Sequence, residues 1–429
     1  MSARTLGQWL DHIGRQHPDA IALGLDRVRE VLARLDATIA CPVITVAGTN
    51  GKGSVCAMLE SVLRASGKRV GLYTSPHILR YNERVRIDGR EAEDRPLSDA
   101  FAAVEEARRG IALTYFEFGT LAAFRIFAQE SLDALVLEVG LGGRLDAVNV
   151  LDADCAVITG IALDHMDYLG GTREDIGREK AGIFRPDRPA VVAEPDLPAS
   201  VEEAARRLGA HLLRLDSEFG YREHPGQWDY WGPGGRRAAL AYPALRGARQ
   251  IRNAAAALAA LDALHEPLPV SMQDVRRGLS EVTLAGRFQV LPGRPRIVLD
   301  VAHNPEAAQA LAANLGASGF AAQTIAVFGM VRDKDIAGVV RQLAPRVTRW
   351  HLASLGGPRG ASAADLARAL AAEGVPAPRM EHPSPAAALD AARREAGEND
   401  KIVAFGSFLT VAAVMQSLAA PGSNAARHA

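Results

Sequence analysis

The segment VITVAGTNGKGS, from Val43 to Ser54, contains residues that could hold the phosphates of a nucleotide. It follows a short β-branched run and precedes a helical pattern, which is the context that a phosphate-binding loop requires. Its glycines let backbone N–H groups approach phosphates, and Lys52 can reach the terminal ones. The spelling departs from the common G-x-x-x-x-G-K-[ST] pattern, because Val46 replaces the first glycine and Gly53 follows the lysine. We therefore predict a nucleotide-phosphate site of unusual form, with Ser54 capping the following helix.

A carboxylate ends an apolar strand in the stretch LEVGLGGRLD, residues 137–146. Burying Glu138 there costs free energy unless the carboxylate binds a cation. Mg²⁺ beside nucleotide phosphates fits, because it is a hard ion that prefers oxygen ligands. An ion pair at the edge of the sheet is the structural alternative. The two glycines that follow are interpreted as room for a ligand near Arg144 and Asp146.

Two further polar groups follow in the same half of the chain. Asp164, His165 and Asp167 crowd one turn directly after another strand, and His165 stands where a second metal ligand would be needed. Lys180, in the sequence EKAGI, falls at the expected end of a helix. By itself this lysine would be read as a solvated surface charge.

The last third of the chain has polar or glycine-rich residues at three expected strand ends. They lie in DVAHNP (300–305), GMVRDKD (329–335) and FGS (405–407). In open α/β sheets ligands bind at the carboxyl ends of the strands. Together the three segments predict a binding face on a second sheet.

Short β-branched runs alternate with longer helical patterns, which predicts parallel sheets covered by helices on both faces. Helices are expected at 54–66, 253–264 and 305–315. The Gly- and Pro-rich, aromatic segment 216–250 predicts a hairpin or short antiparallel excursion. The expected strands are 43–47, 69–73, 134–139, 155–161, 190–193, 296–301, 324–328, 349–353 and 402–405.

The chain of 429 residues is long enough for two or three domains. A boundary is predicted where two prolines and a glycine precede a new strand. The expected division is a first domain at 1–287, a linker at 288–295 and a second domain at 296–429, with 418–429 disordered.

Charge and composition exclude some classes of partner. The chain has 49 basic and 50 acidic residues, which gives no electrostatic case for nucleic acid or an anionic membrane as a partner. Cys41, Cys56 and Cys155 lack metal-ligand spacing and predict buried thiols in a reducing compartment. The N-terminus lacks an apolar signal core, and no apolar run is long enough to span a bilayer. We expect a cytoplasmic monomer.

Taken together, the motifs resemble those of folylpolyglutamate synthases, within the wider group of ATP-dependent Mur-type ligases. GTNGKGS, LEVGLGGRLDA, the Asp-His pair, EKAGI, GRFQV and LDVAHNP occur in one order, over about residues 20–412. The resemblance implies an N-terminal P-loop domain plus a smaller Rossmann-like C-terminal domain. It also implies an acid–amino-acid ligase: ATP phosphorylates a pterin-bearing carboxylate, and the amine of L-glutamate attacks the acyl phosphate.

The resemblance assigns residues to the ATP, metal and phosphoryl-transfer sites. Ser75 and Glu138 would bind one Mg²⁺, and His165 a second. Lys180 would be carbamylated and organise the metal site, and His303 would lie close to the transferring phosphate and the amine. The residues implied to bind ATP are Thr49, Asn50, Gly51, Lys52, Gly53 and Ser54 at the phosphates, and Asn253, Arg287 and Asp300 on the adenosine side.

The resemblance also outlines the sites of the two co-substrates. Phe116 would stack on the pterin ring, and Asp146 would accept hydrogen bonds from its N–H groups. Ser407 is the candidate for the glutamate site. The implied pterin-binding residues are Gly24, Leu25, Asp26, Thr114, Tyr115, Phe116, Glu117, Leu145, Asp146 and Ala147.

Several functions remain open at this point. The motif set, with TYFEFGT and LGLDRV, is most similar to the bacterial bifunctional type, which makes dihydrofolate from dihydropteroate and also extends tetrahydrofolate with glutamates. The alternatives are a folylpolyglutamate synthase alone, another Mur-type amino-acid ligase such as a cell-wall enzyme, and a nucleotide-dependent switch. A phosphate loop so near the N-terminus leaves little room for the nucleotide-sugar domain of a cell-wall ligase. A switch has no need of the LDVAHNP site.

Overall fold

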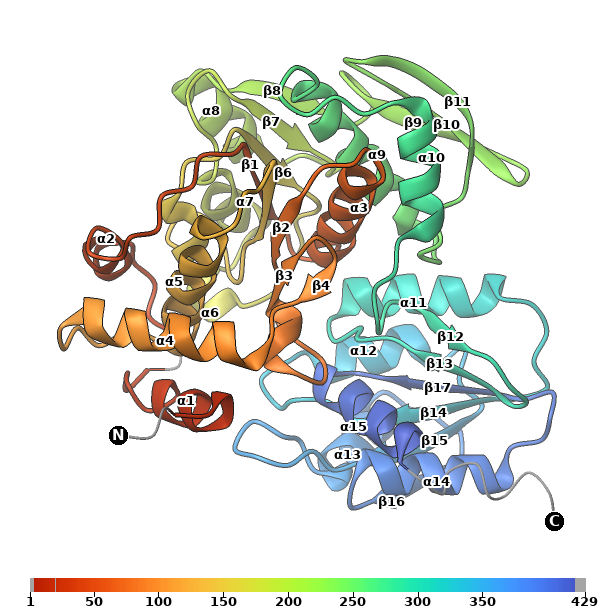
Figure 1. Cartoon of the computed structure of the whole chain (residues 1–429). Coiled ribbons are helices and arrows are strands. Elements are labelled where there is room, and N and C mark those ends of the chain that lie inside the picture. Colours follow the sequence, from red (N-terminus) through yellow and green to blue (C-terminus); the bar gives the residue numbers. More distant parts are fainter. Residues whose placement is uncertain (1–3, 20, 421–429) are drawn as a thin grey trace. The chain divides into compact units, whose positions relative to one another are not determined.

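The computed structural model describes residues 4–19 and 21–420, which form two compact units (Figure 1). The first unit contains the chain up to Ala244 together with Gln250–Val282. The second contains Leu245–Arg249 and the chain from Thr283 onward. The division therefore precedes the expected linker. Segment 288–295 belongs to the second unit, because strand β12 (Gln289–Leu291) pairs antiparallel with β13 (Arg296–Leu299) and its prolines and glycine form the hairpin turn.

The main sheet of the first unit is parallel at its centre and has the order β4-β3-β2-β5-β1-β6-β7-β8. Its central strands are fully buried, as the uninterrupted apolar runs predict for a sheet covered on both faces. The strands are β1 (Val43–Ala47), β2 (Val70–Tyr73), β3 (Val85–Ile87), β4 (Arg90–Glu91), β5 (Ala134–Glu138), β6 (Cys155–Ile158), β7 (Pro189–Val192) and β8 (His211–Arg214).

Helices cover both faces of this sheet. Helix α3 packs on β1, β2 and β5 and carries α10 on its outer side, while α5, α7 and α8 contribute to the hydrophobic core on the opposite face. The 3-10 turns are η1 (Tyr81–Arg84) and η2 (Ala147–Val150). The helices are α1 (Leu6–Ile13), α2 (Asp26–Leu32), α3 (Lys52–Ala65), α4 (Asp94–Arg108), α5 (Tyr115–Ala128), α6 (Met166–Leu169), α7 (Arg173–Ala181), α8 (Ala199–Leu208), α9 (Arg249–Ala263) and α10 (Met272–Glu281).

The expected antiparallel excursion is confirmed as a small sheet of order β11-β10-β9. Its strands are β9 (Gly220–His224), β10 (Gln227–Gly232) and β11 (Gly235–Ala241). Asp262 of α9 joins this sheet to the rest of the unit. Its carboxylate accepts hydrogen bonds from the Tyr230 hydroxyl at 2.7 Å and from Arg237 at 2.6 Å, and it is 1% exposed.

The second unit is a parallel sheet of order β12-β13-β17-β14-β15-β16, in which only β12 is antiparallel. Helices α11, α12 and α13 pack in sequence, and α14 packs with α15. Right-handed crossovers place these two groups on opposite faces. The remaining elements are β14 (Thr324–Phe328), β15 (Arg349–Ala353), β16 (Arg379–His382), β17 (Lys401–Phe405), α11 (Pro305–Ala317), α12 (Ile336–Leu343), α13 (Ala363–Ala372), α14 (Pro385–Glu395) and α15 (Phe408–Ala419).

The predicted fold class, two α/β domains with the P-loop in the first, is confirmed. The sequence did not predict the short edge strands β3, β4, β8, β12 and β16. Helix α15 continues to Ala419, so the disorder expected from residue 418 is not found at 418–419, and 421–429 lie outside the described residues. No helix within the described ranges is long and apolar enough to cross a membrane.

The buried Asp262 carboxylate should be a main support of the β9–β11 sheet. We expect Asp262→Ala to lower the unfolding free energy of the first unit by about 3–5 kcal/mol, because it leaves the Arg237 guanidinium buried without its partner. Urea unfolding, followed by tryptophan fluorescence, measures the change. Arg277→Ala, which removes an exposed pair with Glu281, should change it by less than about 0.5 kcal/mol. Equal effects of the two substitutions would contradict this role of Asp262.

Candidate active site

Four neighbouring strands of the first unit, in the order β2-β5-β1-β6, end at the same edge of the sheet. Ser75 follows β2, Glu138 ends β5, the phosphate loop follows β1, and His165 lies beyond β6. The register pairs Val46, just before the loop, with Glu138. The parallel topology therefore brings the predicted phosphate and metal residues of this unit together.

The phosphate loop leads directly into α3, which begins at Lys52. Gly51 caps this helix in the left-handed conformation (φ 96°), so the prediction that Ser54 is the cap is wrong. Ser54 is instead a buried residue of the first turn. A Cβ on Gly51 would lie 2.8 Å from the Asn253 side-chain oxygen. Asn253, which was predicted to bind the adenosine side of ATP, therefore lies against the loop.

The loop is held by neighbouring backbone groups. The Thr49 N–H donates to the Gly160 carbonyl at 2.8 Å, and the Thr159 hydroxyl donates to the Asn50 carbonyl at 2.7 Å. Lys52 Nζ donates to the Gly48 carbonyl at 3.0 Å. These contacts within the chain fix the conformation of the loop.

Glu138 and Ser75 fit a magnesium site. Glu138 is 5% exposed and accepts a hydrogen bond from the Ser75 N–H at 3.2 Å. Over residues 4–19 and 21–420, no cluster of three or more His, Cys, Asp or Glu side chains could hold a metal by itself. One carboxylate and one hydroxyl are enough for Mg²⁺ beside a nucleotide, because this ion keeps several waters and phosphate oxygens in its shell.

His165 begins α6 in the left-handed conformation (φ 52°), a strained backbone for a residue with a side chain. Its N–H is held by the Asp164 carboxylate at 2.9 Å. Strain of this kind is common at functional sites, which agrees with the position predicted for the second metal ligand.

Lys180 lies on α7 and is only 3% exposed, so it is not a solvated surface charge. Burial, reinforced by the positive charge of Lys52, lowers its pKa to about 7. Asp164 and Asp146 act in the opposite direction. Burial therefore favours the uncharged, nucleophilic amine over the ammonium ion.

The glycine pair after Glu138 allows close packing within the protein. A Cβ on Gly143 would lie 2.9 Å from the Glu179 carbonyl oxygen and 3.0 Å from that of Lys180. Gly143 therefore lets the end of α7 pack closely on this turn, and the Arg144 N–H donates to the Glu179 carbonyl at 2.8 Å. Gly143 thereby helps to position Lys180.

The predicted pterin residues come from three segments that contact one another. Gly24 donates its N–H to the Leu145 carbonyl at 3.2 Å. The Phe116 ring lies 5.9 Å from that of Tyr73 and packs against Gly140. Asp146 is 2% exposed and accepts hydrogen bonds from Leu141 and Val148 N–H groups. Burial raises its pKa to about 7.

Other members of this set have different surroundings. Thr114 and Glu117 form the capping box of α5, and Glu117 also accepts from Arg27 at 2.8 Å. Glu117 thus ties the 22–27 segment to the helix. The Asp26 side chain is fully exposed and faces Arg29 at 3.6 Å. Leu25 is buried, and Ala147 begins η2.

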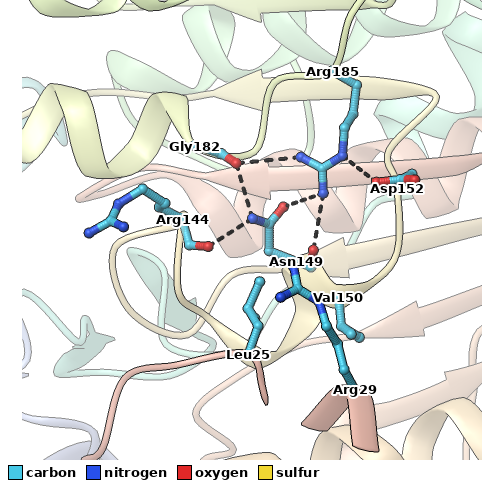
Figure 2. Close-up of a pocket in the computed structure, with 8 residues that line it drawn as sticks. All are labelled: Leu25, Arg29, Arg144, Asn149, Val150, Asp152, Gly182 and Arg185. Atoms are coloured by element: carbon cyan, nitrogen blue, oxygen red, sulfur yellow. Dashed lines mark hydrogen bonds and ion pairs between the residues drawn. The ribbon is translucent and has the colours of Figure 1, made fainter. Parts of the chain in front are cut away.

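A polar pocket of about 440 Å³ lies beside these segments. Its lining residues, drawn in Figure 2, are Leu25, Arg29, Arg144, Asn149, Val150, Asp152, Gly182 and Arg185. The Asn149 amide donates to the carbonyls of Arg144 and Gly182, each at 3.0 Å, and Arg185 donates to the Asn149 side chain and pairs with Asp152 (Figure 2). This network, which no sequence signal marked, fixes the turn that carries Leu145, Asp146 and Ala147.

The predicted residues of the second unit also come together. Arg287 and His303 both lie against the Phe408 ring, at 5.2 and 6.1 Å from its centroid. Asp300 accepts hydrogen bonds from the Phe288 and Ala302 N–H groups, and burial raises its pKa.

Two side chains of this group are oriented by backbone contacts. The His303 Nδ1–H donates to the Val301 carbonyl at 2.8 Å, so a neutral ring has its lone pair at Nε2. Ser407 caps α15 with its hydroxyl and is 6% exposed. Arg287 and His303 of the second unit therefore lie around one ring, that of Phe408, next to Ser407.

Comparison with known proteins gives the class. Residues 46–261 match the model of the Mur ligase middle domain, and residues 286–408 match the Mur ligase, glutamate ligase domain. The fold and the site are those of an ATP-dependent ligase of the Mur type.

Similar individual proteins show which family of Mur-type ligases this chain belongs to. The dihydrofolate synthase/folylpolyglutamate synthase of Escherichia coli (strain K12) is 46% identical over 97% of this chain and 96% of its own length. The structure of E. coli FolC in complex with DHPP and ADP has a TM-score of 0.92 at 46% identity, over 97% of this chain and 98% of that one.

A bifunctional folylpolyglutamate synthase/dihydrofolate synthase with Mn, AMPPNP and L-glutamate bound has a TM-score of 0.89, at 46% identity and over the same shares of the two chains. This chain belongs to the dihydrofolate synthase/folylpolyglutamate synthase family.

The buried Asp146 carboxyl makes the stability of the first unit depend on pH. Its pKa rises from 3.8 to about 7 on folding, so the stability it contributes is complete below about pH 4 and is lost as the pH rises to about 7. We expect Asp146→Asn to flatten the loss of unfolding free energy over this range, as measured by urea unfolding at a series of pH values. Asp26→Asn, at an exposed carboxyl, is the control. Parallel profiles for wild type and Asp146→Asn would show that Asp146 ionises normally.

Proposed function

We propose that this protein joins L-glutamate to dihydropteroate, giving dihydrofolate, and adds further glutamates to tetrahydrofolate, with ATP as the phosphoryl donor. The observation that carries the proposal is the meeting of a phosphate loop, a buried carboxylate and a buried low-pKa lysine at one sheet edge, where the Phe116 ring packs on Gly140. A nucleotide switch needs the first two features alone. Membership of the family supports the choice of substrates.

The reaction has two chemical steps. A carboxylate oxygen of the pterin substrate attacks the γ-phosphorus of ATP, and the bond to ADP breaks. The glutamate amine then adds to the carbonyl carbon of the acyl phosphate, loses a proton, and phosphate leaves. Both steps are accelerated chiefly because the reacting groups are held in a fixed geometry and because the negative charge of the phosphates is neutralised.

In this proposal the residues from Thr49 to Ser54 hold the ATP phosphates, with Lys52 as the charged contact. Ser75 and Glu138 hold one Mg²⁺ and His165 a second. The metal ions, when bound, neutralise the phosphate oxygens and so lower the cost of the attack. The buried Glu138 and the preformed loop keep these groups in place between turnovers.

Lys180 is proposed to carry a carbamate. Its uncharged amine can add CO₂ and lose a proton, which gives a carbamate anion near Lys52. That anion would orient the metal site. The low pKa and the depth of burial support this modification, because only an uncharged amine attacks CO₂.

The remaining assignments concern ATP and the two co-substrates. Asn253, Arg287 and Asp300 hold the adenosine side of ATP, and His303 lies close to the transferring phosphoryl group and the amine. Ser407 contributes to the glutamate site. The pterin ring stacks on Phe116 and donates hydrogen bonds to Asp146, within the set Gly24, Leu25, Asp26, Thr114, Tyr115, Glu117, Leu145 and Ala147.

Release of ADP tests the reaction directly. The purified protein is incubated with ATP, Mg²⁺ and L-glutamate, and with dihydropteroate, tetrahydrofolate or neither, and products are identified by mass. We expect release with both pterins, each gaining one glutamate. Release with tetrahydrofolate alone would leave a folylpolyglutamate synthase, and release with neither would remove the ligase assignment.

Substitution of Lys180 tests the carbamate. Lys180→Ala should lose most turnover, and bicarbonate should not restore it, because no amine remains to be carbamylated. In wild type, ¹³C-labelled bicarbonate should give a carbamate signal in the NMR spectrum that Lys180→Ala lacks. Full activity of the variant would exclude the lysine from the mechanism, and an unchanged spectrum would exclude the carbamate.

A further inference from the structure

Arg84 is a buried arginine that none of the assignments above uses. It is 9% exposed and ends η1, at the close of a loop that begins beyond β2. The Thr74 N–H donates to the Arg84 carbonyl at 2.9 Å, which closes this loop at its base. The Glu83 carboxylate accepts hydrogen bonds from the N–H groups of Ile78, Leu79 and Arg80, each at 2.7 Å. The loop is therefore rigid, and Arg84 has a fixed place.

The guanidinium of Arg84 lies between aromatic rings rather than beside a carboxylate. Its central carbon is 5.3 Å from the Tyr81 ring centroid and 5.6 Å from that of Tyr115. Its Nε donates to His77 Nδ1 at 2.8 Å. Among the residues that the structure describes, no Asp or Glu forms an ion pair with it, and Glu83 next to it is occupied by backbone N–H groups.

A buried charge without a counter-charge is costly, and two ring faces offset only part of that cost. Arg84 can be compared with Arg86, two residues further on in β3, which pairs with the buried Glu60. Of the five N–H donors of Arg84, only Nε has a partner in the described chain. The two terminal nitrogens have no partner in the described chain, and they are not completely buried. This arrangement is a prepared position for an anion.

The surroundings indicate which anion. Tyr115 belongs to the proposed pterin site, and Ser75, at the other end of the same loop, donates its N–H to Glu138 of the proposed metal site. The acceptor carboxylate has to span this interval, between the pterin ring and the phosphates. A guanidinium fork matches a carboxylate or an acyl phosphate in two parallel hydrogen bonds.

We propose that Arg84 binds the substrate carboxylate that is phosphorylated, and then the acyl phosphate formed from it; this inference rests on the proposed function. One carboxylate oxygen forms the bond to the γ-phosphorus as the bond to ADP breaks, while Arg84 holds the other. Arg84 transfers no proton. When the amine has added and phosphate has left, the neutral amide no longer matches the guanidinium, which favours release.

Comparison of two ligands tests this role. Binding of dihydropteroate and of the same molecule with hydrogen in place of the carboxylate is measured by calorimetry for wild type, Arg84→Gln, Arg84→Lys and Arg80→Gln. Arg80 is the matched control, because it lies on the same loop with its side chain 63% exposed. We expect wild type and Arg80→Gln to prefer the carboxylate ligand by about 10- to 100-fold, the range typical of a hydrogen bond to a charged group.

Arg84→Gln should abolish this preference while binding the carboxylate-free ligand as wild type does, and Arg84→Lys should keep part of it. The KM for the pterin substrate should rise with that for ATP unchanged. The melting temperature of Arg84→Gln should be unchanged or higher, because an uncompensated buried charge has been removed.

Four results would overturn the proposal. One is an Arg84→Gln protein that keeps the carboxylate preference. Another is equal loss of affinity for both ligands together with a lower melting temperature, which would make Arg84 a structural support. The third is a wild-type protein that binds neither ligand, which would remove the proposed function as well. The fourth is a wild-type protein that binds both ligands equally, which would remove the role of Arg84 and leave the proposed function standing.

Discussion

The parallel register of four strands is the constraint on which the active site of the first unit depends. Because β2, β5, β1 and β6 run in the same direction, everything that follows them emerges at one edge. Ser75, Glu138 and the phosphate loop are separated by many residues in sequence, and the pairing of Val46 with Glu138 removes that separation. A slip of one residue in this register would turn Glu138 to the other face of the sheet.

Several ionisable side chains are buried near this edge. Glu138 and Asp146 are buried carboxyls, Lys180 is a buried amine and Arg84 is a buried guanidinium. Burial of such groups costs free energy, so their presence together is unusual for an ordinary core. In the proposed function, the carboxyls and the basic groups give separate positions for ligands of opposite charge.

Much of the fold was predictable because the strongest signals are local. The buried runs at 43–47 and 324–328 match β1 and β14 residue for residue, since a strand covered on both faces must be apolar throughout. The short edge strands β4 and β16 are mostly exposed and carry no such signal. Segment 288–295 was misread because a hairpin turn and a linker use the same residues, proline and glycine.

Site residues that belong to a contiguous sequence motif could be predicted, whereas features that depend on contacts between distant parts of the chain could not. The Gly142–Gly143 pair was interpreted as room for a ligand, and nothing in the sequence indicates that a Cβ on Gly143 would meet the end of α7, far along the chain. Likewise, nothing in the segment HILRYNERVR distinguishes Arg84 from its neighbours. Arg84 differs from its neighbours because its guanidinium lies against the Tyr115 ring and has no ion-pair partner in the described chain. Both features depend on the fold.

Close packing around Lys180 changes the pKa of its amine. The close approach at Gly143 buries the end of α7, and burial withdraws water from the lysine amine. Lys52, which must remain a cation to meet phosphates, disfavours a second positive charge nearby. Burial first, and the charge of Lys52 second, therefore lower the pKa of this amine. A carbamate there would change repulsion into attraction, so that the phosphate loop and the modified lysine would stabilise each other.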